Sequence, residues 1–383
     1  MILALSITHR CNLSCRYCGG IERKYDGQKI KDISYEEICG LLEIGRKYRI
    51  KNLTITGGEP FVRKDIFRIL EYGAELGYAI SILSNGTLIN KDKAKKLSQI
   101  SHIEQVRVSM ESPEKETFEY YRGNGAYEKV LTGLRNLHKY SVPTGIGFTV
   151  YPENVDIVER MVRFCVAEDI HLIRIVYGVS AYQARNLHFG KEFIQQILIR
   201  IINSMIKYNK YINLETINSP TPVEIISGKE CPAGKYYFFV DSTGRMIPCP
   251  FIPEECKDII RIEKVHSVDD FKNMKDYMLN LSDRIYHNLR GKCKNCELNK
   301  RCKGGCLAEK LTKGYKIYDE QPICIKNILE EVIKKFNHAK GVEDILDLWV
   351  YYTHLWKISE MSNVYCTRQL PIWTIPLNVG KFY

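Results

Sequence analysis

Three cysteines near the start of the chain have a spacing that suits a metal centre. Cys11, Cys15 and Cys18 form a C-x3-C-x2-C run directly after the short apolar segment Ile2–Ile7. Thiolates this close together can hold one soft metal centre. In a cubane iron–sulfur cluster, three thiolates leave the fourth iron without a protein ligand, and a small molecule can bind and be reduced there. Zinc is the alternative, although zinc knuckles usually pair their cysteines as two C-x2-4-C hooks.

A second set of cysteines lies in the later part of the chain. Its members are Cys231, Cys249, Cys293, Cys296, Cys302, Cys306 and Cys324. Disulfides are not expected in a reducing compartment, so clustered cysteines there indicate metal ligands or catalytic groups. Two full cubanes need eight thiolates, so either one iron stays open or Cys256, seven residues after Cys249, supplies the eighth. One or two zinc sites are the alternative for this set.

The elements that position these cysteines follow an alternating strand and helix pattern from residue 2 to about 210. Short β-branched runs bounded by Gly, Pro, Asn or Ser predict strands. We expect them over Ile2–Ile7, Leu53–Thr56, Ala79–Ser84, Gln105–Met110, Gly145–Tyr151 and His171–Tyr177. Helical patterns lie between them, which predicts a parallel sheet with helices outside. In a curled sheet of this kind the ligand lies at the carboxyl ends of the strands, where the first cysteine run falls.

The pattern changes after the helical segment Phe193–Tyr208. A small hairpin is expected from Tyr236–Val240 to Met246–Ile247, with its turn at Asp241-Ser242-Thr243-Gly244. Over residues 331–383 we expect a helix followed by an extended aromatic tail. The sequence therefore divides into 1–214, 215–330 and 331–383.

Composition and charge limit the class of protein. Hydrophobic residues make up 45% and charged residues 26% of the chain, which is ordinary for a soluble globular protein. No apolar run reaches the roughly 18 residues of a membrane span, and the first residues lack the basic region and cleavage site of a signal peptide. We expect a cytoplasmic protein with no membrane partner. The formal charge of +11 is spread along the chain, so a nucleic-acid partner is not expected either.

The first cysteine run and its flanks, Thr8-His9-Arg10-Cys11 to Cys18, resemble the signature of the radical S-adenosylmethionine (SAM) enzymes. The resemblance implies that Cys11, Cys15 and Cys18 are the catalytic cysteines and hold a [4Fe–4S] cluster. In that family the free iron chelates SAM, and one electron cleaves SAM to a 5′-deoxyadenosyl radical.

Three further segments and two single residues resemble SAM-binding parts of that family. Gly57-Gly58-Glu59-Pro60 resembles its GGEP motif, which holds the SAM ammonium; glycines allow close approach to a ligand and a carboxylate pairs with an amine. Ser84-Asn85-Gly86-Thr87 resembles the segment near the SAM ribose and methionine. Ser109-Met110-Glu111 resembles S-x-D, which contacts ribose hydroxyls, with Glu where Asp is commoner. Tyr17 is the expected aromatic beside adenine, and Arg122 can reach the SAM carboxylate or the substrate.

The second cysteine set resembles the SPASM domain, an auxiliary-cluster module found behind many peptide-modifying radical SAM barrels. The resemblance implies two auxiliary iron–sulfur clusters, both [4Fe–4S], and it divides their ligands. The second cluster takes Cys293, Cys296, Cys302 and Cys324, and the first takes Cys231, Cys249 and Cys306, with Cys256 or an open iron completing it. The implied fold is α/β: a partial (β/α)6 TIM-like barrel, a small cysteine-rich SPASM domain and a carboxyl-terminal helical and extended segment.

These resemblances imply an enzyme that uses SAM to remove a hydrogen atom and so oxidatively modifies or cross-links a peptide or protein side chain. The auxiliary clusters would take or relay electrons. The expected partners are that substrate and a low-potential electron donor in anaerobic conditions. Recognition of the substrate would come from a separate protein, from the carboxyl-terminal piece or from the rim of the barrel. The alternatives are a radical SAM dehydrogenase acting on a small molecule in cofactor or antibiotic synthesis, and a metal-stabilised binding scaffold without enzyme activity.

Overall fold

A computed structural model gives the fold of most of the chain. The residues that it describes are 1–18, 31–177, 187, 189–208, 210–217, 231–252, 254–256, 259–320, 323–324, 326–328 and 331–332. Residues Met1–Phe336 form one compact unit. The second unit, Asn337–Tyr383, lies outside the described residues, and so do the predicted carboxyl-terminal helix and aromatic tail beyond residue 332.

One sheet of ten strands, in the order β10-β9-β8-β1-β2-β3-β4-β5-β6-β7, organises the described part. Its first seven strands are β1 (Ile2–Ser6), β2 (Asn52–Thr56), β3 (Ala79–Ser84), β4 (Ile103–Ser109), β5 (Thr144–Val150), β6 (Leu172–Tyr177) and β7 (Asn213–Ile217). Each of these pairs in parallel with the next. The six predicted strands are therefore confirmed, and β7 adds a seventh that the sequence pattern did not predict.

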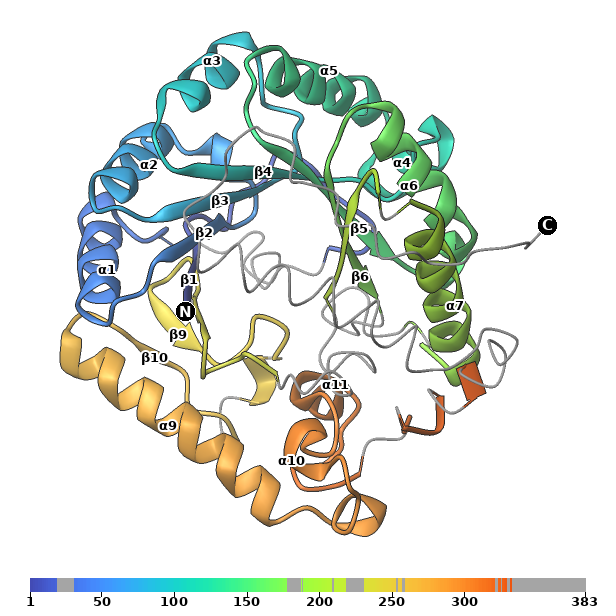
Figure 1. Cartoon of the computed structure of the whole chain (residues 1–383). Helices are drawn as coiled ribbons and strands as arrows, with labels where there is room; N and C mark the ends of the chain where they lie inside the picture. Colours follow the sequence, from blue (N-terminus) through green and yellow to red (C-terminus); the bar gives the residue numbers. More distant parts are fainter. Residues whose placement is uncertain are drawn as a thin grey trace. The chain divides into compact units, whose positions relative to one another are not determined.

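The helices cover the outer side of this curved row of strands (Figure 1). They are α1 (Tyr35–Lys47), α2 (Ile66–Glu75), α3 (Lys91–Gln99), α4 (Lys115–Arg122), α5 (Ala126–Lys139), α6 (Val158–Ala167) and α7 (Lys191–Tyr208). A Cβ on Gly73 of α2 would lie 3.1 Å from Leu53 and 3.3 Å from Ile80, so these two strand residues face the helices. Because side chains alternate along a strand, their neighbours in sequence face the inside of the barrel.

The cysteine-rich region continues the same sheet. It contributes β8 (Tyr237–Val240), β9 (Arg245–Ile247), β10 (Glu263–Lys264), α9 (Val268–His287), α10 (Asn299–Cys302) and α11 (Leu307–Thr312). The predicted hairpin is present, because β8 pairs antiparallel with β9. In addition β8 lies parallel to β1, with Ile2 opposite Tyr237 and Leu5 opposite Val240. The predicted boundary at residues 214 and 215 is therefore crossed by a continuous sheet.

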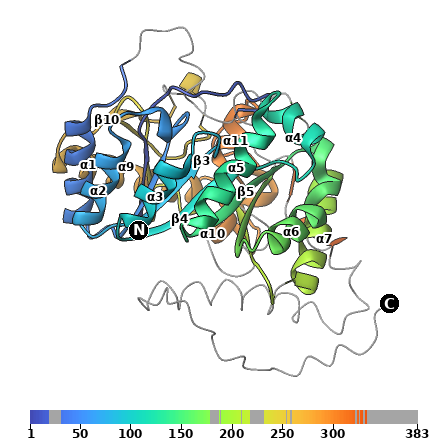
Figure 2. The same ribbon diagram turned by 90° about the horizontal axis from the view of Figure 1, so that it is seen from above.

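Short 3₁₀ helices complete the described elements: η2 (Pro60–Val62), η3 (Pro152–Ile157), η5 (Glu254–Cys256) and η6 (Gly291–Cys293). Seen from above, α3 and α5 lie in front of the strands, and α10 and α11 lie behind them (Figure 2). Among the helices described, none combines the length and the apolar character needed to cross a bilayer.

Candidate functional site

The first three cysteines share one electrostatic environment at the carboxyl end of β1. Burial raises the pKa of the Cys11 thiol, and Cys15 and Cys18 add to the rise. Burial also raises the pKa of Cys15, where Cys18 acts in the same direction. The three thiols are thus close enough to affect one another's pKa, and their role as ligands of one cluster stays a prediction.

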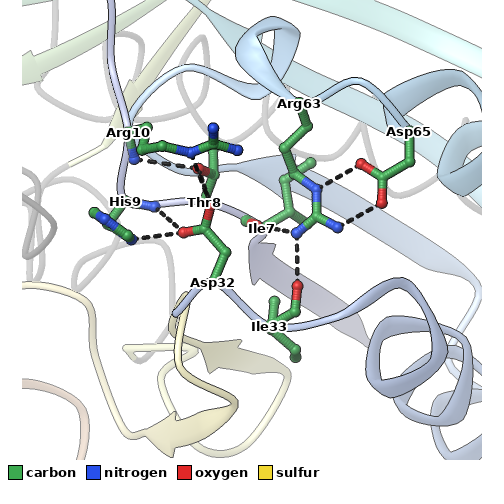
Figure 3. A network of polar contacts seen from close by, with 8 residues as sticks. All are labelled: Ile7, Thr8, His9, Arg10, Asp32, Ile33, Arg63 and Asp65. Atoms are coloured by element: carbon green, nitrogen blue, oxygen red, sulfur yellow. Dashed lines mark hydrogen bonds and ion pairs between the residues drawn. The ribbon is translucent and has the colours of Figure 1, made fainter. Parts of the chain in front are cut away.

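Asp32 fixes the backbone that leads into these cysteines (Figure 3). One of its oxygens accepts the Thr8 hydroxyl at 2.7 Å, and the other accepts the His9 N–H at 2.9 Å. The Nε of Arg10 donates to the same carboxylate at 3.1 Å. Burial acts to raise the pKa of Asp32, but the hydrogen bonds from His9, Thr8 and Arg10 outweigh it and the pKa lies below its usual value. The sequence analysis missed Asp32, which carries no motif.

Arg63 ties the end of β1 to the segment that precedes α1 (Figure 3). Its Nη1 donates to the carbonyl oxygens of Ile7 at 2.6 Å and Ile33 at 2.7 Å. Asp65 pairs with the same guanidinium through bonds of 2.9 and 2.6 Å. Arg63 is 7% exposed, so its charge is neutralised where it is buried. Arg63 is therefore a second residue that positions the cysteine loop, and no sequence motif indicated it.

Gly57 and Gly58 let the end of β2 approach the cysteine loop. The Gly58 N–H donates to Thr8 O at 2.7 Å, and the Glu59 N–H donates to Arg10 O at 2.9 Å. A Cβ on Gly58 would lie 2.3 Å from Arg10 O, and one on Gly57, whose φ is +148°, would lie 2.5 Å from Thr8 O. We expected these glycines to approach a ligand; the close approach in the structure is to the chain's own cysteine loop.

Glu59 joins the ends of β2 and β3 from a fully buried position. Its Oε1 accepts the Phe61 N–H at 3.1 Å and the Ser84 hydroxyl at 2.9 Å, and its Oε2 accepts the Asn85 N–H at 2.7 Å. Burial raises the pKa of this carboxyl, against the effect of these donors. Pro60 opens η2 directly after it. The carboxylate therefore holds two motif segments in place, and its expected contact with the SAM ammonium stays a prediction.

Asn85, after β3, reaches the cysteine loop directly. Its Nδ2 lies 3.8 Å from the Cys11 Sγ and donates to the Asn12 Oδ1 at 2.9 Å. Its Oδ1 accepts the Thr87 N–H and hydroxyl, at 2.9 and 2.6 Å. The structure thus brings Asn85, a predicted cofactor-binding residue, to the first cysteine of the run, whereas the Ser84 hydroxyl donates to Glu59.

Glu111 and Arg122 form an ion pair beside Cys15. The Arg122 Nε donates to a Glu111 oxygen at 2.5 Å, and the Arg122 Nη1 lies 3.5 Å from the Cys15 Sγ. Burial acts to lower the pKa of Arg122, but Glu111 and Cys15 hold it well above its usual value. We expected Glu111 and Arg122 to contact SAM separately. In the structure they pair with each other. Ser109 is the last residue of β4, two residues before Glu111.

Tyr17 belongs to a group of three tyrosines. Its ring centre lies 4.8 Å from that of Tyr151 and 6.0 Å from that of Tyr121. The Tyr17 hydroxyl donates to Glu153 at 3.0 Å, and the Tyr151 hydroxyl donates to the Tyr17 carbonyl at 3.0 Å. These contacts hold the loop between Cys15 and Cys18 against α4 and η3. Contact of Tyr17 with adenine stays a prediction.

The seven later cysteines fall into two electrostatic groups. Burial raises the pKa of Cys249, and Cys306 and Cys231 raise it further. Burial likewise raises the pKa of Cys302 to about 11, with further rises caused by Cys293, Cys296 and Cys324. This grouping agrees with the division into three and four that the SPASM resemblance implied, and the role of these cysteines as cluster ligands stays a prediction.

Cys256 differs from these cysteines in the charges that act on it. It is 8% exposed and belongs to an apolar cluster against which Cys249 and Cys306 also pack. Burial raises the pKa of its thiol, and the charge that adds to the rise is that of Glu255. Its predicted role as the eighth ligand gains no support from this placement. Within the described ranges, no three His, Cys, Asp or Glu side chains are arranged as ligands of a single metal ion.

Buried cations beside the thiols test whether these residues fit an iron–sulfur cluster. Lys310 is 1% exposed, and its Nζ donates to the Ile317 carbonyl at 3.3 Å. Burial lowers the pKa of Lys310, while Cys293 and Cys302 act to raise it. A buried ammonium needs negative charge nearby, which thiolates bound to a cluster would supply. Arg122 gives Cys15 a similar counter-charge, so both regions fit an anionic sulfur-ligated group.

Comparison with known proteins agrees with this site. The model of the Radical SAM superfamily matches residues 5–165. The AdoMet-dependent heme synthase of Methanosarcina barkeri is 26% identical over 353 residues, which cover 85% of this chain and 96% of that protein. Mycofactocin maturase MftC of Mycolicibacterium smegmatis is 23% identical over 336 residues, which cover 85% and 82%.

Solved structures show the same fold. Streptococcus suis SuiB bound to the precursor peptide SuiA has a TM-score of 0.70 at 17% identity, covering 84% of this chain and 75% of SuiB. The structure of anSMEcpe with bound AdoMet and Cp18Cys peptide has a TM-score of 0.67 at 21% identity, covering 88% and 99%. With its cysteine run, its GGEP segment and this match, residues 5–165 form a radical SAM domain, and the chain is an enzyme whose cofactors are SAM and iron–sulfur clusters.

Proposed function

We propose that this enzyme oxidatively modifies or cross-links a side chain of a peptide substrate by hydrogen-atom abstraction. The observation that carries the radical chemistry is the group of three thiols beside Arg122 at the carboxyl edge of the barrel. Two comparisons support a peptide substrate. The fold resembles that of SuiB bound to its precursor peptide, and the sequence resembles that of the maturase MftC.

Under this proposal Cys11, Cys15 and Cys18 hold the [4Fe–4S] cluster, and the segments around Glu59, Asn85 and Ser109 hold SAM. When bound, these groups supply a carbon radical that removes hydrogen from an unactivated C–H bond. Arg122 opposes the rise in the pKa of Cys15, because its positive charge favours the thiolate that binds iron.

The neighbouring residues keep this site in one arrangement. The Asn85 amide lies against the Cys11 sulfur, and a donor at that position stabilises negative charge on it. Glu59 joins the ends of β2 and β3, and Asp32 holds the start of the cysteine loop after β1. The protein thus orients the cofactors, while the hydrogen abstraction is theirs.

The later cysteines would hold two auxiliary clusters, and Lys310 would balance their charge. Groups that accept electrons suit a net oxidation or the formation of a cross-link. We infer that the first auxiliary group has three thiolates, Cys231, Cys249 and Cys306, because Cys231 and Cys306 both raise the pKa of Cys249, whereas the charge that acts on Cys256 is that of Glu255. A low-potential electron donor and a separate recognition protein complete the proposed partners.

Anaerobic reconstitution with SAM, a reductant and short peptides encoded beside the gene tests the proposal. We expect 5′-deoxyadenosine and, by mass spectrometry, a peptide that has lost hydrogen. Replacing Cys11, Cys15 and Cys18 by Ala should abolish both products, whereas Cys39→Ala in α1 should abolish neither. Unchanged 5′-deoxyadenosine formation in the triple variant would contradict the assignment of the catalytic cysteines.

A small-molecule substrate is the second candidate. The relative with 26% identity is named a heme synthase, which favours oxidation of a small molecule rather than a peptide. The same assay with a porphyrin in place of the peptides separates the two candidates. A scaffold without activity would produce no 5′-deoxyadenosine with either substrate.

A further inference from the structure

Arg107 of β4 points into the barrel, and the proposed function leaves it without a role. Paired residues of parallel strands face the same side of the sheet. Ile80 of β3 faces α2. Ile82, two residues later on the same face of β3, pairs with Val106. Val106 therefore faces the helices, and Arg107 faces the interior. The register continues from Arg107 to Gly145 of β5.

Two glycines of β5 leave room for the Arg107 side chain. Gly145 pairs with Arg107, and Gly147 pairs with Arg174 of β6, so both glycines face the interior. A Cβ on Gly147 would lie 3.4 Å from the Arg107 Cδ. The arginine therefore lies across Gly147, over a part of the barrel wall where β5 presents no side chain.

The charges around this position do not cancel. Arg174 donates through its Nε to Glu215 of β7 at 2.6 Å, so these two charges neutralise each other. Arg107 is 7% exposed, and among the described residues its buried Nε has no hydrogen-bond acceptor. The neighbouring Gln105 Oε1 is likewise buried without a donor among them. A buried cation without an anionic partner is costly.

Arg107 stays charged at neutral pH in these surroundings. Burial and the nearby Arg174 lower the pKa of Arg107 to about 9, while Glu215 and Tyr237 act to raise it. Burial also raises the pKa of Tyr237, so this phenol is neutral. Among the described residues Arg107, Arg174 and Glu215, one positive charge thus remains in excess.

We propose that Arg107, lying across Gly147, forms with the glycines of β5 a recess inside the barrel that binds a carboxylate of the substrate. This inference rests on the proposed peptide substrate, because peptides offer carboxylates at their carboxyl terminus and on Asp and Glu side chains. A planar guanidinium binds a carboxylate through two parallel hydrogen bonds.

Capped amino acids test the recess on the full-length reconstituted enzyme. N-acetylalanine carries a terminal carboxylate, N-acetylglutamate N-methylamide carries one on its side chain, and N-acetylglutamine N-methylamide is neutral. We expect at least one carboxylate probe to bind about tenfold or more tightly than the neutral probe in calorimetric titration. The probe preferred identifies which carboxylate of a peptide is recognised. Equal binding of all three probes would overturn the proposal.

Variants locate the binding. Arg107→Gln should remove the preference for carboxylate, Arg107→Lys should retain part of it, and Arg135→Gln on the exposed face of α5 should leave it unchanged. Gly147→Val keeps the charge of Arg107 but fills the recess, so it should also lose the preference for carboxylate. This variant tests the proposal if Arg107→Gln fails to fold.

Cofactor measurements separate this inference from the proposed function. Iron content, SAM affinity and 5′-deoxyadenosine formation without substrate should be unchanged in Arg107→Gln. If that variant loses SAM affinity or iron instead, Arg107 serves the cofactors, and the carboxylate recess is wrong while the proposed function stands. Binding of inorganic phosphate in preference to both carboxylate probes would also overturn it.

Discussion

At the scale of single residues, the cysteine loop is held by side chains outside its motif. Asp32 receives hydrogen bonds from Thr8, His9 and Arg10, and Arg63 binds the carbonyls of Ile7 and Ile33. The cysteine spacing made the thiols predictable, because three sulfur donors in one short run have few other uses. A lone aspartate in a loop gives no such signal, since its partners are fixed only by the fold.

Asp32→Asn should destabilise the folded chain at neutral pH. It removes a charge that accepts several hydrogen bonds, which costs on the order of 1.5–3 kcal/mol. Because the pKa of Asp32 is lowered by folding, its contribution is full above the unfolded pKa of about 4 and is lost as the pH falls through the lower folded value. Urea unfolding of both proteins at a series of pH values measures this difference.

The control for this prediction is Asp156→Asn. Asp156 is exposed and pairs with Arg200 at the surface, where ion pairs contribute roughly 0–1 kcal/mol. If Asp32→Asn behaved like Asp156→Asn at neutral pH, Asp32 would not anchor the loop.

Arg107 carries a signal that is visible in the sequence, although it was not used to predict a site. It stands between Val106 and Val108 in a segment that the sequence predicted as a strand. Alternation along a strand places it opposite to both valines, and a charged residue inside a barrel is uncommon enough to notice. The register that sets it beside Gly147 and near Arg174 required the structure.

At the scale of elements, local patterns predicted most of the barrel. The six expected strands are present, because the alternation that predicts them is a local property of the sequence. Strand β7 was missed, since Asn213–Ile217 mixes polar and apolar residues over a short length. The pairing of β8 with β1 joins segments far apart in the chain, and no local pattern encodes such a pairing.

Gly58→Ala should disrupt the contact between the end of β2 and the cysteine loop. The new Cβ would lie 2.3 Å from Arg10 O, and backbone on both sides must shift, at a cost of about 1–3 kcal/mol or more. We expect a lower thermal midpoint and loss of iron from the first cysteine group, measured by unfolding and iron analysis.

Gly40→Ala in α1 is the matched control. A Cβ there meets nothing within 4 Å, and Ala is favoured over Gly in a helix by roughly 1 kcal/mol. This variant should be as stable as the parent or more so. Equal behaviour of the two substitutions would show that the loop tolerates a side chain at Gly58.

At the scale of the whole molecule, the cysteine-rich region and the barrel share one sheet. β8 covers the edge of β1, and Ala4 of β1 packs in the same apolar cluster as Phe239 and Ile247. The spacing of the later cysteines indicated a separate module, but spacing alone does not say which strand edge a module covers. The compact unit of residues 1–336 follows from this pairing.

Truncation after residue 217 should therefore yield an aggregating protein. It uncovers the edge of β1, and an unpaired strand edge is a template for association. We expect little soluble monomer by size-exclusion chromatography. Truncation after residue 336 keeps β8 and the whole compact unit, so it should remain soluble. A soluble monomeric 1–217 fragment would show that β8 is dispensable for the barrel.

The pairing of β8 with β1 also places the two cysteine groups at opposite ends of these strands. Cys11 follows the carboxyl end of β1, whereas Cys249 follows β9, which runs back toward the Tyr237 end of β8. The paired strands span four residues, or about 13 Å at roughly 3.3 Å per residue. Under the proposed function, a molecule inside the barrel would face an electron source at one mouth and an electron sink at the other. Electrons would then pass from one end of the barrel to the other through the bound substrate.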